Sequence, residues 1–248
     1  MQLVSTPAIV LQAFKYGDSS KIVRLATRDH GLQSAIAKGA ARPKSPFGAR
    51  LELLSQGTAQ LYLKATRDLQ TLSAFDLVAQ HRDLARDLRR FAAASALAEL
   101  VLRCAPTEPH PAVFDVLVEG LERLQRSSSV QLDPGELVAL WRMVGVLGFT
   151  PVLGDCVRDG RQVPTGKVTF SIQDGGLLCE ECARGVEGSV LGPTDIAVLR
   201  DIVAGEQDVP QQSPPTWAAH RRLLARFVRH HLAEARDLKA LGFWEQHA

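Results

Sequence analysis

The hydrophobic pattern of the chain changes its period near residue 81, and this change restricts the possible folds. Before it, apolar and polar residues alternate, as at Leu61 and Leu63, which is typical of strands with one buried face. From His81 onward, the apolar residues recur at the spacing of amphipathic helices. The sequence therefore predicts an α+β chain of more than one domain, with a β-rich domain over residues 1–80 and a helical domain over residues 81–248.

The β-rich domain contains three stretches that predict short strands, namely residues 6–14, 21–40 and 49–78. Turns are expected between them and at Gly57 or Asp68. Together these stretches predict five or six short strands with little helix, which favours a small closed β-barrel. An open sheet of hairpins covered by helices is the alternative that the pattern leaves open.

The helical domain contains five segments with helical periodicity. They are residues 81–105, 111–127, 133–148, 193–205 and 216–235. Asp133 is expected to cap the third of these helices, with Pro134 at its first position. Residues 150–190 interrupt the helical pattern and are rich in glycine and cysteine, so we expect them to form a small insertion, here called the knuckle insertion.

Three of the four cysteines lie in the knuckle insertion at spacings typical of a metal site. Cys179 and Cys182 form a C-x-x-C pair, which a tight turn can bring to ~2.3 Å from one zinc ion. A complete site needs a second pair some 15–20 residues away, and Cys156 begins the segment "CVRD" at about that distance. The sequence therefore predicts a structural Zn²⁺ bound by Cys156, Asp159, Cys179 and Cys182, with a carboxylate as an unusual fourth ligand.

Two other interpretations of these cysteines remain open. The pair could be small apolar residues of a degenerate knuckle without metal. It could also be a redox dithiol, although such a pair normally begins a helix beside a βαβ pattern, which this sequence lacks. A catalytic zinc is disfavoured because no histidine lies near the cysteines to complete an open site.

The charge of the chain is unevenly distributed. Residues 1–80 hold ten Lys/Arg residues against five Asp/Glu residues, although the net charge of the whole chain is only +2. Four of these cations lie in the segment "AKGAARPKSPFGAR", residues 37–50, here called the basic loop. Glycine and proline prevent a regular element there, so the loop presents cations on an irregular backbone, with Phe47 as an aromatic for stacking. The predicted DNA contacts of this loop are Lys38, Arg42, Lys44 and Arg50. A solvated loop between two strands is the alternative.

The last predicted helix is basic and amphipathic. Arg222, Arg226 and Arg229 follow an i, i+4, i+7 spacing and therefore share one face. An apolar stripe beside them is expected to pack on the helical body rather than on a membrane. The basic face could contact DNA or an acidic partner peptide.

No catalytic motif is found in the sequence. It has no Walker loop, dinucleotide-binding glycine pattern, nucleophile elbow or HExxH motif, which favours a binding module over an enzyme. A zinc-dependent hydrolase would need an open metal position and a base, for which only Asp159 or Glu180 would serve. No apolar run approaches the ~20 residues of a membrane span, and no secretion signal is recognised, so we expect a cytoplasmic protein.

Taken in order, five stretches of the chain resemble the RecO family of bacterial recombination mediators. They are "IVLQAFKYGDSSKIVRLATRDHGL", "AKGAARPKS", "LGFTPVLGDC", "FSIQDGGLLCEEC" and "RRLLARFVRHHLAEARDLKALGF". The resemblance implies an N-terminal OB-fold barrel, a helical C-terminal domain and a zinc element within that domain. It also implies a DNA-repair function in the bacterial cytoplasm, at the nucleoid, with no nucleotide hydrolysis.

The expected activities follow from the same resemblance. Such proteins bind single- and double-stranded DNA, anneal complementary strands, and act with RecR and RecF to load recombinase onto DNA coated by single-strand-binding protein. Two positions depart from the family pattern. Asp159 replaces a cysteine of the CxxC…CxxC site, and Ala41 stands where the loop pattern KGARR has a second cation. A protein-interaction scaffold, in which the basic C-terminal helix binds an acidic peptide, is the alternative function.

Overall fold

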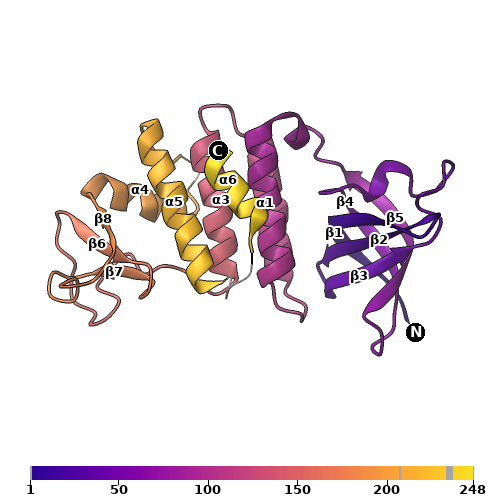
Figure 1. Cartoon of the computed structure of the whole chain (residues 1–248), viewed down its shortest axis with the longest axis horizontal. Coiled ribbons are helices and arrows are strands. Elements are labelled where there is room, and N and C mark those ends of the chain that lie inside the picture. The colour runs from indigo at the N-terminus through magenta and orange to yellow at the C-terminus, as the bar shows by residue number, and fades with distance from the viewer. Residues whose placement is uncertain (1, 207, 233–236, 248) are drawn as a thin grey trace. The chain divides into compact units, whose positions relative to one another are not determined.

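A computed structural model of the chain describes residues 2–206, 208–232 and 237–247 (Figure 1). The chain divides into two compact units. The first consists of Met1–Arg86 and Ala98–Val118, and the second of Asp87–Leu97 and Glu119–Ala248. The expected fold class is confirmed, because a β-rich N-terminal part is followed by a helical part that contains a possible metal-binding cluster.

Five strands of the first unit form a closed barrel in the order β1-β2-β3-β5-β4. The strands are β1 (Gln2–Tyr16), β2 (Ser20–Thr27), β3 (Gly31–Ala37), β4 (Gln56–Leu63) and β5 (Leu69–Ala79). Only the pair β3–β5 is parallel among these strands. The long strand β1 pairs with β4 along its first half and with β2 along its second half, which closes the sheet on itself. This OB-like arrangement is the predicted closed barrel rather than the open sheet.

The barrel interior is apolar and tightly packed. Val10, Val23, Leu25 and Leu61 are fully buried in it. Gly57 lies inside β4 and not at a turn, so that expectation was wrong, whereas Asp68 does lie in the turn between β4 and β5. A Cβ atom at residue 57 would lie 2.4 Å from the carbonyl oxygen of Asp76, so this position requires glycine for β4 and β5 to pair.

The helices α1 (Leu88–Cys104) and α2 (Pro111–Arg126) supply the rest of the first unit through residues 98–118. Arg28, at the end of β2, donates two hydrogen bonds to the Asp115 carboxylate, at 2.9 and 3.0 Å. Helix α1 begins later than the predicted residue 81. Residues Leu84–Arg86 form a 3₁₀ turn first, and His81 has a positive φ of 47° that no helix accommodates.

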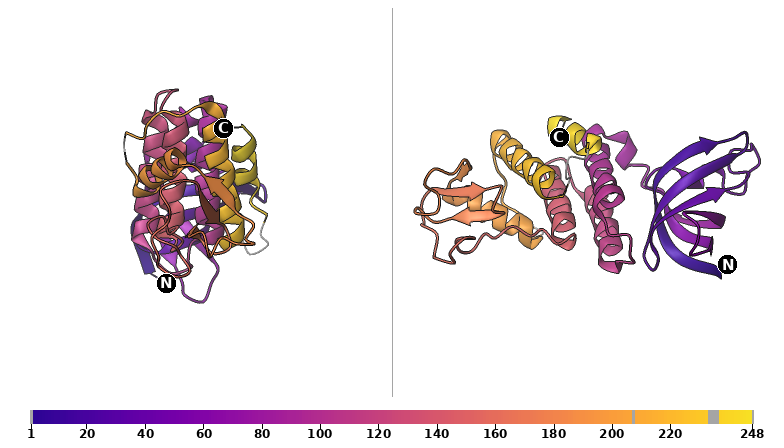
Figure 2. Two further views of the ribbon diagram at one scale, coloured as in Figure 1. Left: turned by 90° about the vertical axis from the view of Figure 1, so that its left-hand side faces the viewer. Right: turned by 60° about the horizontal axis from the view of Figure 1, so that its bottom comes forward.

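Four helices of the second unit pack around buried aromatic side chains. They are α3 (Leu132–Val146), α4 (Pro193–Ala204), α5 (Pro214–His231) and α6 (Lys239–His247). The rings of Trp141 on α3 and Phe227 on α5 meet edge to face with centroids 5.1 Å apart, and α3 and α5 lie side by side (Figure 2). Helix α5 begins two residues before the predicted start, and the predicted residues 233–235 lie outside the described part of the chain. Helix α6 was not predicted, and it buries Trp244.

Asp133 does not cap α3, contrary to the prediction. The helix begins two residues earlier than predicted, at Leu132, with Gln131 at the N-cap. The Asp133 carboxylate instead accepts hydrogen bonds from Arg89, at 2.7 Å, and Arg221, at 2.6 Å. The same two arginines lie 3.4 and 3.3 Å from Glu136, which is fully buried. A partly buried network of four ionisable side chains, here called the charge network, therefore joins α1, α3 and α5.

The knuckle insertion contains a small sheet of three strands in the order β7-β6-β8. These are β6 (Val168–Ser171), β7 (Gly176–Leu178) and β8 (Ser189–Leu191). Two side chains attach the insertion to the helices. Arg200 on α4 donates to the carbonyl oxygen of Leu153 at 2.7 and 2.9 Å, and His231 on α5 donates from Nε2 to the carbonyl oxygen of Ile172 at 2.7 Å.

Candidate metal centre and nucleic-acid surface

The four predicted metal ligands come together in the knuckle insertion. One donor atom from each of Cys156, Asp159, Cys179 and Cys182 lies within 4.8 Å of the others. Two tight turns achieve this arrangement. Gly160 donates its N–H to the Cys156 carbonyl at 2.9 Å in the first turn, and Ala183 donates to the Cys179 carbonyl at 2.9 Å in the second. The cluster could therefore hold a metal ion.

The distances from the carboxylate oxygen to two of the sulfurs fit one tetrahedral ion. Asp159 Oδ2 lies 3.5 Å from Cys179 Sγ and 3.3 Å from Cys182 Sγ. Metal–sulfur bonds of ~2.3 Å and metal–oxygen bonds of ~2.0–2.2 Å at tetrahedral angles place an oxygen and a sulfur ligand about 3.5 Å apart. The cluster thus matches a site for a single ion with three sulfur donors and one oxygen donor.

Interactions within the cluster shift the pKa values of its donor groups in different directions. The Asp159 carboxylate, together with burial, raises the pKa of the Cys182 thiol to about 12. Burial of Cys156 opposes ionisation of its thiol. Nevertheless, hydrogen bonds from backbone N–H groups lower the pKa of Cys156. The N–H of Cys179 contributes most, followed by those of Asp159 and Arg158. Hydrogen bonds from the Cys156 thiol and the Arg161 backbone hold the pKa of Asp159 well below its usual range. Thiols bind a metal as thiolates, so binding would release protons.

The basic loop is fixed to the barrel by buried apolar residues. Ala40, Phe47 and Leu51 all belong to the barrel core. Ala41 also donates its backbone N–H to the Ser19 carbonyl oxygen, at 2.9 Å, at the turn between β1 and β2. Because Phe47 is only 4% exposed, it cannot stack on a base, and that expectation was wrong.

The cations of the basic loop, unlike these anchors, are accessible to solvent. All four of the predicted residues, Lys38, Arg42, Lys44 and Arg50, are exposed. Within the described ranges, none of them forms an ion pair with a carboxylate. The loop therefore carries unneutralised positive charge on an anchored backbone.

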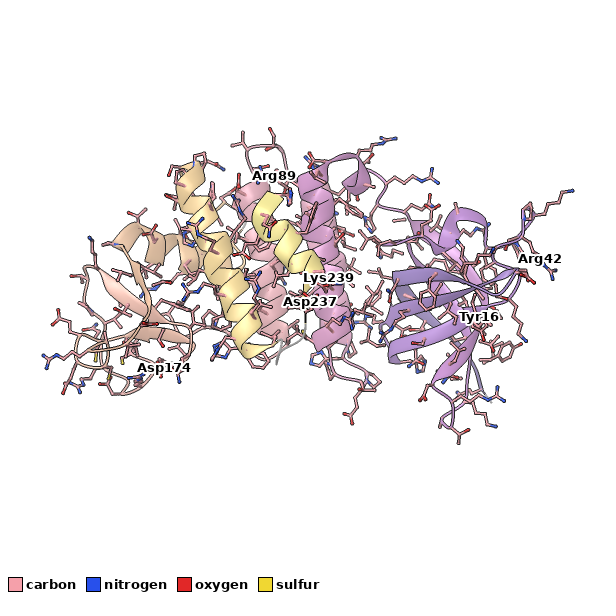
Figure 3. All side chains as sticks on the ribbon, viewed as in Figure 1. Tyr16, Arg42, Arg89, Asp174, Asp237 and Lys239 are labelled. Carbon is pink, nitrogen blue, oxygen red and sulfur yellow. The ribbon has the colours of Figure 1, made fainter. Side chains whose placement is uncertain are left out.

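Two aromatic residues that the sequence interpretation missed lie on the outer surface of the barrel. Phe14 and Tyr16, at the end of β1, are 45% and 53% exposed. Phe14 pairs with Ile22 of β2, which pairs with Ile36 of β3, so a row of apolar side chains crosses three strands. Tyr16 and Arg42 both project outward from the barrel (Figure 3). The signal in the sequence was the two-residue spacing of the aromatics, which places both on one face of a strand.

The predicted arginines of α5 lie on one exposed face. Arg222, Arg226 and Arg229 are all exposed, as the helical spacing required. Arg229 Nη2 pairs with Glu245 Oε2 at 2.5 Å, so the charge of Arg229 is offset by α6. Arg221, their neighbour in sequence, is 7% exposed and belongs to the charge network instead.

Comparisons with known proteins cover nearly the whole chain. Residues 1–81 match a family model described as recombination protein O N terminal, and residues 85–241 match one described as recombination protein O C terminal. The chain belongs to the RecO family. It is 31% identical over 258 residues to the DNA repair protein RecO of Streptomyces coelicolor (strain ATCC BAA-471 / A3(2) / M145), with 99% of the chain and 100% of that relative covered. The resemblance inferred from the five sequence stretches is confirmed.

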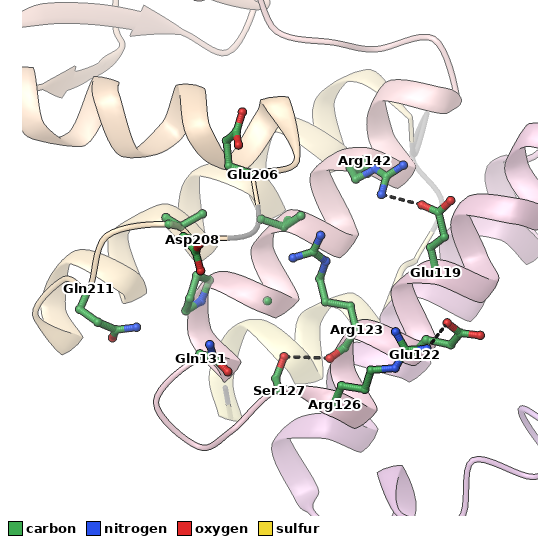
Figure 4. A pocket seen from close by; sticks show the side chains of 14 residues that line it. Glu119, Glu122, Arg123, Arg126, Ser127, Gln131, Arg142, Glu206, Asp208 and Gln211 are labelled. Carbon is green, nitrogen blue, oxygen red and sulfur yellow. Dashed lines mark hydrogen bonds and ion pairs between the residues drawn. The ribbon is translucent and has the colours of Figure 1, made fainter.

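This RecO-family chain also has a pocket of about 490 Å³ between α2, α3 and the segment after α4 (Figure 4). Two of its arginines are already paired, Arg142 with Glu119 and Arg126 with Glu122, each at 2.6 Å. Arg123 projects into the pocket, where burial, and to a lesser extent Arg142, lowers its pKa. Acidic residues after α4 also line the pocket, so its lining favours neither sign of charge. Among the described residues, no helix of this RecO-family chain is long and apolar enough to cross a membrane.

Proposed function

We propose that this RecO-family protein is a DNA-binding recombination mediator in DNA repair. In this role it binds single- and double-stranded DNA without sequence preference and anneals complementary strands. It acts with RecR and RecF to load recombinase onto DNA coated by single-strand-binding protein. Family membership and the name of the Streptomyces relative support the repair role.

The observation that carries the proposal is the construction of the basic loop. Its four exposed cations lie on a backbone held at both ends by buried anchors, so the loop loses little conformational entropy when it binds a polyanion. Phosphate contacts made by such cations release counterions and give affinity that is independent of sequence and falls with salt. Annealing requires only that two polyanions be held close and neutralised, which a binding surface can do without catalysis.

The exposed aromatics beside the loop add a preference for unpaired bases. Phe14 and Tyr16 each offer a ring on which a splayed base can stack, which is worth roughly 1–3 kcal/mol per base. Bases within a duplex are already stacked on one another. We therefore assign phosphate contacts to the basic loop for both forms of DNA, and stacking to β1 for single strands only.

The metal proposed for the knuckle insertion is a structural Zn²⁺ bound by Cys156, Asp159, Cys179 and Cys182. Three sulfur donors and one oxygen donor gathered within 4.8 Å suit zinc, and four protein ligands leave no open position for a substrate. This favours a structural role over a zinc-dependent hydrolase.

The test is salt-dependent binding of oligonucleotides to the full chain. The double variant Arg42→Ala with Lys44→Ala should weaken binding to every sequence and reduce the slope of log K against log salt by roughly 1.4–1.8. The matched control is Lys167→Ala with Arg184→Ala, which removes the same charge from exposed positions of the second unit. Unchanged binding between ~50 and 200 mM salt, or an equal loss in the control, would exclude the basic loop as the DNA site.

A second candidate function is a scaffold that binds an acidic peptide through α5. The exposed arginines Arg222 and Arg226 favour it, because no carboxylate forms an ion pair with either of them in the described ranges. Substituting both by alanine while measuring the binding of an acidic peptide and of DNA separates the two functions. Loss of peptide binding with DNA binding retained would assign α5 to the scaffold role.

A further inference from the structure

Arg161 contacts both turns of the candidate metal centre. Its backbone N–H donates to Asp159 Oδ1 at 3.1 Å, and its Nε pairs with Asp159 Oδ2 at 2.9 Å. Its Nη1 donates to Glu181 Oε2 at 2.7 Å, and Glu181 lies between Cys179 and Cys182. Its carbonyl oxygen accepts the N–H of Cys156 at 2.8 Å. One residue thus connects the turn that carries Asp159 to the turn that carries the C-x-x-C pair.

A carboxylate at a knuckle position needs orientation that a thiolate does not need. A cysteine offers a single donor atom, whereas an aspartate has two oxygens and rotates about its terminal torsion with little resistance. In this chain, the Arg161 guanidinium and backbone fix both oxygens, and Oδ2 is held 3.3 Å from Cys182 Sγ. The ion pairs of Arg161 are largely exposed, since its side chain is 60% accessible, so their contribution to folding is small. Their clearest effect is therefore the orientation of Asp159.

We infer that Arg161 is the positioning residue that makes Asp159 a competent fourth metal donor, and that the resulting set of three sulfurs and one oxygen selects zinc over softer cations. The inference rests on the proposed zinc site. Groups that orient a ligating carboxylate typically contribute 10–100-fold to metal affinity. Thiolate donors favour soft cations, so replacing a fourth thiolate by an oriented oxygen disfavours Cd²⁺ more than Zn²⁺.

The experiment is metal titration of the stripped full chain under a non-thiol reductant. Co²⁺ serves as the spectroscopic probe, and Zn²⁺ and Cd²⁺ compete with it against a chromophoric chelator. The variants are Arg161→Ala, Asp159→Cys and the two combined. Arg184→Ala is the matched control, because Arg184 is an exposed arginine of the same insertion. Circular dichroism checks that each variant retains the helical content of the parent.

We expect Arg161→Ala to weaken Zn²⁺ binding 10–100-fold and Arg184→Ala to leave it unchanged. In the Asp159→Cys background, the Arg161→Ala effect should fall below about threefold, because no carboxylate remains to be oriented. The Asp159→Cys chain should also move the Co²⁺ absorption to longer wavelength and bind Cd²⁺ more tightly relative to Zn²⁺ than the parent does.

Three results would overturn the inference. The Arg161→Ala variant could bind Zn²⁺ as tightly as the parent. Alternatively, Arg161→Ala could lower Zn²⁺ affinity by the same factor in the Asp159→Cys background, which would show that Arg161 supports the fold and does not act through Asp159. A parent that takes up neither Co²⁺ nor Zn²⁺ would remove the zinc site itself. None of these results depends on DNA binding, so the test is independent of the mediator function.

Discussion

The amide nitrogen of Ala41 donates a hydrogen bond of 2.9 Å to the carbonyl oxygen of Ser19, which ties the basic loop to the turn between β1 and β2. The bond uses only backbone atoms, and the side chain of Ala41 is exposed. Residue 41 can therefore change its side chain without changing the anchoring of the loop. This is also the position at which the resemblance to the loop pattern KGARR leads us to expect a cation.

Restoring that cation should strengthen DNA binding. In Ala41→Arg, one additional phosphate contact is expected to steepen the slope of log K against log salt by roughly 0.7–0.9. The measurement is fluorescence anisotropy with labelled oligonucleotides over a salt series. Ala41→Gln is the control for side-chain length without charge. An equal gain in the glutamine variant would contradict an electrostatic origin.

Removing the exposed aromatics should separate the two forms of DNA. Phe14→Ala and Tyr16→Ala are each expected to cost roughly 1–3 kcal/mol in single-strand binding, or about 5- to 150-fold in affinity, with little change for a duplex. Val78→Ala, on the exposed surface of β5, is the control. An equal loss of affinity for single-stranded and duplex DNA would show that the rings stabilise the barrel and do not stack on bases.

The charge network around the buried Glu136 should make unfolding depend on pH. Burial raises the pKa of Glu136 to about 7, against the opposing effects of Arg89 and Arg221. The folded chain therefore holds this proton more tightly than the unfolded chain. The contribution of Glu136 to the free energy of unfolding should consequently fall as pH rises from about 4.5 to 7, by up to about 3 kcal/mol.

Glu136→Gln should flatten the pH dependence of unfolding in this interval. Urea denaturation of both chains from pH 5 to 7.5 measures the change, and the exposed acid Glu187, replaced by glutamine, is the control. A variant whose stability declines as steeply with pH as that of the parent would show that Glu136 stays ionised in the folded chain.

Chelation should destabilise the knuckle insertion and leave DNA binding by the barrel nearly unchanged. The metal site and the basic loop belong to different compact units, so losing the ion removes the link between the turns at Cys156 and Cys179 only. Limited proteolysis before and after chelation should show new cleavage within residues 150–190. A parallel loss of oligonucleotide affinity would mean that the metal supports the DNA site.

Periodicity predicted the division into a β-rich part and a helical part, because a strand and an amphipathic helix place apolar residues at different intervals. The number of short strands before His81 favoured the closed barrel over an open sheet, and the CxxC spacing led to Asp159 as the fourth member of the cluster. Tertiary interactions explain the errors. Aspartate is a favoured N-cap residue, but two arginines distant in sequence, Arg89 and Arg221, bind the carboxylate of Asp133.

Phe47 was misassigned for a related reason, and the exposure of Phe14 and Tyr16 was not recognised. The glycine- and proline-rich sequence around Phe47 predicts an exposed ring, but the ring packs into the barrel core and is buried there. Phenylalanine in an apolar strand is often a core residue. Phe14 nevertheless lies on the outer face of the barrel, because successive side chains of a strand point to opposite faces. Which face becomes the interior depends on how the sheet closes, and this cannot be inferred from one strand.

The incorporation of residues 98–118 into the first unit affects how this protein can be truncated. A polypeptide ending at residue 80 would lack Asp115, so Arg28 would lose its ion-pair partner. Such a fragment would carry one more uncompensated cation than the intact chain and would overestimate affinity for DNA. A fragment that ends after residue 118 retains the ion-pair partner of Arg28. An N-terminal fragment used to measure DNA affinity should therefore extend at least to that residue.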